Sequence, residues 1–147
     1  MIHNVKDIAK KIIAQANPDC GDIMTNMKLQ KLLYYMQGFH LAFFDEPLFH
    51  DEIEAWMYGP VVPAVYEEYK ACGSAGLDLN PDEDILSLNE EEEDMFNQVY
   101  EAYGQFSALK LMNMTHAETP WKSTAVGYGN VISKDKIKAY FSTQVEA

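Results

Sequence analysis

Apolar residues recur along the first third of the chain with the spacing of amphipathic helices. In residues 5–16 they fall at three- and four-residue intervals behind Asn4, which predicts a capped surface helix with one inward face. The Asn-Pro-Asp sequence at residues 17–19 is expected to end it, because proline disfavours helix at the preceding residue. Thr25 is placed to cap a second helix over residues 26–44, whose apolar residues cover most of its circumference. This pattern is typical of a buried central helix.

The pattern changes after the second helix. Residues 48–58 carry β-prone side chains separated by acidic ones, which predicts a short strand or an extended arm. Gly59-Pro60 is predicted to form a turn, with Pro60 and Pro63 in the first turn of the helix that follows. Residues 82–88 are predicted to include a second short strand.

Three further helices are predicted in the second half of the chain. Their expected caps are Asn89, Ser107 and Ser133. The first opens with five consecutive acidic residues, which complement the positive end of a helix. Residues 115–130 are predicted to form a long loop between the last two helices. The fold class is therefore a mainly α, compact single domain over residues 1–147, with about six helices and a possible small two-stranded β element.

Charge is distributed unevenly along the 147 residues. The net charge is −12, no arginine is present, and residues 39–109 hold one lysine against seventeen acidic residues. This balance argues against non-specific binding to nucleic acid or to anionic membranes. Two cysteines make no disulfide framework, and no signal peptide or apolar run of membrane-spanning length is seen. We therefore expect a soluble, cytoplasmic protein.

The residues that carry catalytic or metal chemistry elsewhere are poorly arranged here. The histidines and aspartates that could converge on a metal ion are His40, His50, Asp45 and Asp51. They lack the spacing of a recognisable metal motif, and no serine-nucleophile or phosphate-loop motif occurs. The acidic run over residues 82–94 is more typical of a solvated face than of a tuned acid–base pair. The prediction is a non-enzyme without metal or cofactor.

Nucleic-acid binding is the alternative function. A modest basic patch in the first third of the chain would be formed by Lys10, Lys11, Lys28 and Lys31. Such lysines usually occupy the solvent face of an amphipathic helix, and arginine, the residue best suited to guanine and phosphate, is missing. A phage-associated regulator that binds nucleic acid through these lysines is therefore kept as the second hypothesis.

Several motifs, in order along nearly the whole chain, carry a family resemblance. They are MKLQKLLYY at residues 27–35, EPLF at 46–49, IEAWMYGPVVPAVY at 53–66, Thr115-His116, Pro120-Trp121 and the closing segment 132–141. Together they resemble the Panacea domain, also known as a phage-associated domain of unknown function. The resemblance implies a mostly helical antitoxin of a toxin–antitoxin pair that neutralises its cognate toxin by direct protein contact. The resemblance also implies that the toxin is encoded by a neighbouring gene.

The resemblance also implies a related branch of proteolytic adaptors that deliver the toxin to an ATP-dependent protease. It supplies no catalytic residues. Met57 departs from the basic or polar residue expected at its position, which bears on the partner surface, and no appended DNA-binding domain is evident. The oligomeric state stays open.

The candidate partner site combines amphipathic aromatic residues with the later family motif. We expect Trp56, Tyr58, His116 and Trp121 to lie near one another and to form or support the surface that binds the toxin. The alternative is that Trp56 and Trp121 are buried anchors that hold the Gly59-Pro60 turn. The acidic middle of the chain would steer association with a basic partner.

Overall fold

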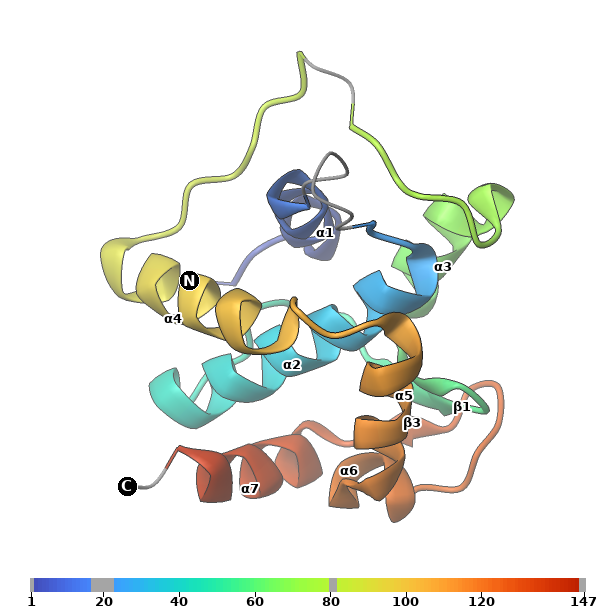
Figure 1. The fold of residues 1–147 in the computed structure, drawn as a ribbon. Helices are drawn as coiled ribbons and strands as arrows, with labels where there is room; N and C mark the ends of the chain where they lie inside the picture. The colour runs from blue at the N-terminus through green and yellow to red at the C-terminus, as the bar shows by residue number, and fades with distance from the viewer. Residues whose placement is uncertain (1, 17–22, 80–81, 146–147) are drawn as a thin grey trace.

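The long second helix, α2 (Asn26–Phe44), lies at the centre of the protein (Figure 1). In the computed structural model, which describes residues 2–16, 23–79 and 82–145, α2 contacts α1, α3, α4, α5 and α7. The other helices of this part of the chain are α1 (Val5–Gln15), α3 (Pro63–Tyr69), the short 3₁₀ helix η2 (Lys70–Cys72), α4 (Glu90–Tyr103), α5 (Ala108–Ala117), α6 (Thr119–Lys122) and α7 (Lys134–Gln144). The mainly helical prediction is confirmed.

Local capping chemistry sets the ends of α2 where the sequence predicts them. The Thr25 hydroxyl accepts a hydrogen bond from the Lys28 amide at 3.2 Å, and Asp45 ends the helix with a left-handed backbone at φ 59°. The helix is buried on nearly all sides, as expected for a central element. Phe43 is the exception, because its side chain lies in the last turn and is 51% exposed.

The caps predicted for α1, α4, α5 and α7 are also confirmed. The side chains of Asn4, Asn89, Ser107 and Ser133 each accept a hydrogen bond from a backbone amide in the first turn. The predicted stop at residues 17–19 lies outside the described residues. No helix within residues 2–16, 23–79 and 82–145 combines the length and the apolar character needed to cross a bilayer.

The β element is a three-stranded antiparallel sheet rather than a two-stranded one. Its strands are β1 (Ile53–Trp56), β2 (Gly59–Val61) and β3 (Val131–Ile132), in the order β2-β1-β3. The predicted turn at Gly59-Pro60 is wrong: the hairpin turns at Met57 and Tyr58, and both Gly59 and Pro60 belong to β2. Pro60 is tolerated there because β2 is an edge strand of this sheet.

Two other predictions are corrected. Residues 82–88 form no strand and cross the surface as an extended segment, while the second strand lies directly after the hairpin turn. The predicted loop over residues 115–130 is helical in its first half, because α5 continues to Ala117 and α6 follows at Thr119–Lys122. Pro120 sits in the first turn of α6, where its missing amide hydrogen leaves no helical bond unmade.

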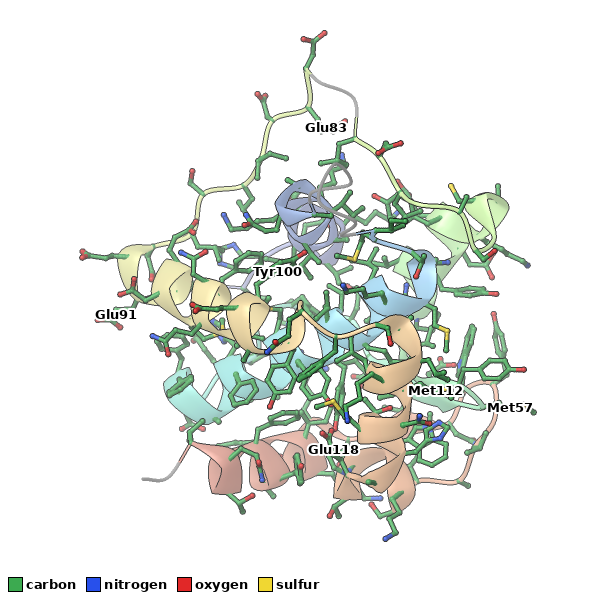
Figure 2. The ribbon with its side chains drawn as sticks, viewed as in Figure 1. Met57, Glu83, Glu91, Tyr100, Met112 and Glu118 are labelled. Carbon is green, nitrogen blue, oxygen red and sulfur yellow. The ribbon has the colours of Figure 1, made fainter. Side chains whose placement is uncertain are left out.

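A buried carboxylate joins α2 to the junction between α5 and α6. Glu118, which separates these two helices, accepts hydrogen bonds from the hydroxyls of Tyr34 at 2.9 Å and Tyr35 at 2.8 Å. Burial raises the pKa of Glu118, although the two tyrosine hydroxyls act in the opposite direction. Figure 2 shows Glu118 in the interior, between these helices and α7. These hydrogen bonds hold the junction between α5 and α6 against α2.

A second buried carboxylate ties the acidic helix α4 to α2. Glu92 belongs to the acidic run expected to face solvent, but it is 3% exposed and accepts hydrogen bonds from His40 at 2.7 Å and His3 at 3.3 Å. Burial raises the pKa of Glu92, but the bonds from His40 and His3 outweigh it and hold the pKa below its ordinary 4.5. The acidic start of α4 is therefore partly structural.

This arrangement predicts a contribution to acid sensitivity. A carboxyl group whose pKa is depressed by folding contributes stability above the pKa of the unfolded chain, and that stability is lost as the pH falls through the folded value. We expect Glu92→Gln to flatten the loss of stability between about pH 5 and pH 3. Urea midpoints measured across this range check it, with the exposed Glu91→Gln as control. An unchanged pH profile in Glu92→Gln would contradict the assignment.

Candidate functional site

The tip of the β1–β2 hairpin presents large apolar side chains to solvent. Met57 and Tyr58 form the turn and are 67% and 61% exposed, and Tyr128, from the segment before β3, is 75% exposed. We call these three residues, with Trp56 at their base, the hairpin surface. Figure 2 places Met57 at the outer edge of the molecule. Exposed apolar side chains gathered in this way are typical of protein interaction sites.

Trp56 connects the two parts of the hairpin surface. Its ring stacks on Tyr128 at a centroid distance of 4.9 Å and meets Tyr66 edge-on at 5.0 Å. The Trp56 indole donates a hydrogen bond to Glu54 Oε1 at 2.9 Å, and the same oxygen accepts one from the Gly129 amide at 2.8 Å. Glu54 therefore fixes the turn that carries Tyr128 against the hairpin.

His116 and Trp121 support the hairpin from the helices behind it. Their rings stack at a centroid distance of 3.9 Å, and the Trp121 indole donates to the Trp56 carbonyl oxygen at 2.8 Å. His116 hydrogen-bonds the Met57 backbone. Burial lowers the pKa of His116, as does the nearby charge of Lys31. The ring is therefore neutral at pH 7, and its buried Nε2 has no hydrogen-bond partner within the described residues.

The structure thus brings all four predicted site residues into one cluster, but they differ in their exposure to solvent. Tyr58 is exposed, whereas Trp56, His116 and Trp121 are half-buried and bind one another or the hairpin backbone. The hydrogen bond of Trp121 also fits the anchor alternative. That these residues contact a partner stays a prediction. The contribution of Tyr128 was missed, although its flanking glycines indicate an exposed turn.

The histidines and aspartates considered for a metal site have other partners in the structure. Within the described ranges, no group of three histidine, cysteine or acidic residues is placed to hold a metal ion. His40 faces Glu92, and Asp45 pairs with Lys138.

The predicted basic patch for nucleic acid does not form. Lys11, Lys28 and Lys31 are buried, with exposures of 6%, 6% and 1%. Lys10 and Lys11 bind Glu83 at 2.6 Å and Glu93 at 2.7 Å, so their charges face carboxylates. Lys11, Lys28 and Lys31 therefore have no solvent face, and Lys10 is half-buried against a carboxylate.

Comparisons with known proteins point to one family. A family model described as "Antitoxin SocA-like, Panacea domain" matches residues 29–122, which include the hairpin, His116 and Trp121. A curated relative, "Antitoxin SocA" of Caulobacter vibrioides (strain NA1000 / CB15N), is 33% identical over 118 residues. The match covers 72% of this chain and 62% of the relative, so the chain spans less than two thirds of that protein. No solved structure matches the chain significantly.

Proposed function

Because the chain belongs to the SocA-like Panacea family of antitoxins, we propose that it neutralises a toxin protein by binding it directly through the hairpin surface. The observation that carries the proposal is the exposed cluster of Met57, Tyr58 and Tyr128 on a hydrogen-bonded base. Most of this cluster lies inside the matched segment. The proposed mechanism requires binding alone and no catalytic step.

The energetics of such a surface suit a tight protein complex. Tyrosine and tryptophan bury large rings with few rotatable bonds, and a small central group of such residues usually dominates the binding free energy. Trp56 and Tyr128 already stack on each other, so little side-chain freedom is lost when a partner covers them.

The acidic residues have a separate part in the proposal. The start of α4, where Figure 2 labels Glu91, lies on the opposite side of the view from Met57 on the hairpin. These charges are therefore placed to attract a basic toxin over a distance rather than to contact it at the hairpin. Long-range attraction of this kind raises the association rate and is weakened by salt.

Co-expression with the product of the adjacent reading frame tests the function. We expect that product alone to arrest growth, and this chain to restore growth and to co-purify with the toxin. A harmless neighbour that does not bind would contradict the proposal.

The half-life of the toxin separates the two forms of the proposal. Neutralisation by binding leaves the half-life unchanged or longer. Faster loss of toxin that depends on an ATP-dependent protease would instead assign this chain the role of a proteolytic adaptor.

A further inference from the structure

A cavity of about 260 Å³ opens beside the hairpin surface. Its walls include Met27, Lys31, Trp56, Tyr58, Val61 and Tyr66. The cavity is large enough for one amino-acid side chain and part of its backbone. Since Trp56 and Tyr58 belong both to these walls and to the hairpin surface, a partner on that surface would cover the opening.

Lys31 is the unusual residue of this cavity. Its side chain comes from the central helix α2 and is 1% exposed. The one hydrogen bond that its ammonium makes within the described residues goes to the Pro60 carbonyl oxygen, at a long 3.4 Å. An ammonium has three protons to donate. Burial without a carboxylate lowers the pKa of Lys31 to about 7.

The neighbouring lysines differ from Lys31 because each has a closer polar partner. Lys10 and Lys11 each face a glutamate, and Lys28 donates to the Gly104 carbonyl at 2.7 Å. A buried cation without a counterion destabilises a fold relative to an apolar residue of the same length. Burial of Lys31 therefore lowers the stability of the fold by an amount that its contacts within the protein do not offset.

The hairpin is shaped to leave room for this lysine. Gly59 has φ 113°, and a Cβ atom there would lie 2.6 Å from Lys31 Cε and 3.0 Å from Thr115 Oγ1. Glycine at this position allows the β2 backbone to pass directly over the lysine stem. The position of Lys31 is thus set by α2, which carries the residue, and by β2, which passes over its side chain.

We propose, on the basis of the antitoxin function above, that this cavity receives the C-terminal residue of the toxin. The apolar side chain of that residue packs on Trp56 and Tyr66, and its terminal carboxylate binds Lys31 Nζ. A chain terminus carries an apolar side chain and a carboxylate on one residue, which matches a cavity with aromatic walls and a single buried cation. Lys70, which also lines the cavity, is exposed and lies 3.9 Å from a Glu67 carboxylate oxygen, so Lys31 is the one of these two cations without a carboxylate partner among the described residues.

Matched small molecules test the chemistry without the toxin. We expect the full-length chain to bind N-acetyl-phenylalanine at least about ten times more tightly than N-acetyl-phenylalaninamide, with millimolar affinity, by NMR titration of the Trp56 indole signals. Lys31→Met removes the charge and keeps the length of the side chain. This variant should lose the preference for the acid while its melting temperature rises by about 4 °C or more. Lys110→Met, an exposed control, should change neither quantity.

Several outcomes would overturn the inference. Equal binding of acid and amide, or an unchanged preference in Lys31→Met, would show that the lysine does not select a carboxylate. Tighter binding of N-acetyl-glutamic acid α-amide would assign the cavity to an internal acidic side chain instead of a terminus.

The toxin itself provides the second arm. Deleting its last residue should weaken its complex with this chain at least about tenfold. Full affinity of the truncated toxin would overturn the inference and leave the proposed function standing. If no toxin binds, the proposed function fails, while the small-molecule preference remains separately measurable.

Discussion

Serine at both Met57 and Tyr58 is expected to weaken the complex with the toxin at least about 100-fold, because hot-spot side chains each contribute about 2 kcal/mol or more. The midpoint of thermal unfolding should stay within about 2 °C of wild type, since the two side chains are mostly exposed and leave little buried surface behind. Calorimetric titration of the toxin and a melting curve of the free chain measure the two quantities.

The controls separate contact from support. Leu109→Ser changes a residue that is 61% exposed on α5, outside the hairpin surface, and should alter neither quantity. Trp121→Ala removes the stack on His116 and the hydrogen bond to the Trp56 carbonyl oxygen. We therefore expect it to lower the midpoint of thermal unfolding, unlike the substitutions at the tip. Unchanged toxin affinity in the Met57 and Tyr58 double variant would exclude the hairpin tip as the contact.

Gly38→Ala is expected to destabilise the protein by about 3 kcal/mol, the upper range for overpacking a core. Gly38 lies where α2 meets α7, and a Cβ atom there would overlap the Phe141 ring. That ring cannot move aside freely, because Tyr34, Phe39 and two other rings surround it at 4.9–5.8 Å. The gain in helix propensity, about 1 kcal/mol, is too small to compensate. Urea denaturation measures the difference.

A second substitution makes this result specific. Phe141→Leu, which removes the flat ring at the point of overlap, should recover part of the stability lost in Gly38→Ala. If Gly38→Ala unfolds at the wild-type urea concentration, then α2 and α7 do not pack as closely as described.

Sequence reasoning succeeded where the determining interactions are local. The caps of α2 and α4 use a side chain and an amide within three residues, so the pattern alone predicts them. The hairpin turn was misplaced because Met57 and Tyr58 carry none of the usual turn residues, whereas the adjacent Gly-Pro pair does. Strand β3 escaped prediction since two residues hold no pattern and their partner strand lies far away in the sequence.

The candidate site shows the same division. The motif resemblance grouped Trp56, Tyr58, His116 and Trp121, but the stacking and hydrogen bonds among them exist only in the folded chain. Periodicity treated Lys31 as a solvent-facing residue of an amphipathic helix. A helix covered on all sides has no such face, so the lysine is buried and its charge becomes a feature of the site.

The carboxylate of Glu54 has a consequence for how this surface can diversify. It holds the hairpin and the turn of Gly129 from below, and the backbone bonds of His116 and Trp121 hold the hairpin from behind. The side chains of Met57 and Tyr58 take no part in these bonds. Substitutions at the tip therefore leave these supporting bonds intact, so the surface can vary at these two positions while the hairpin keeps its shape.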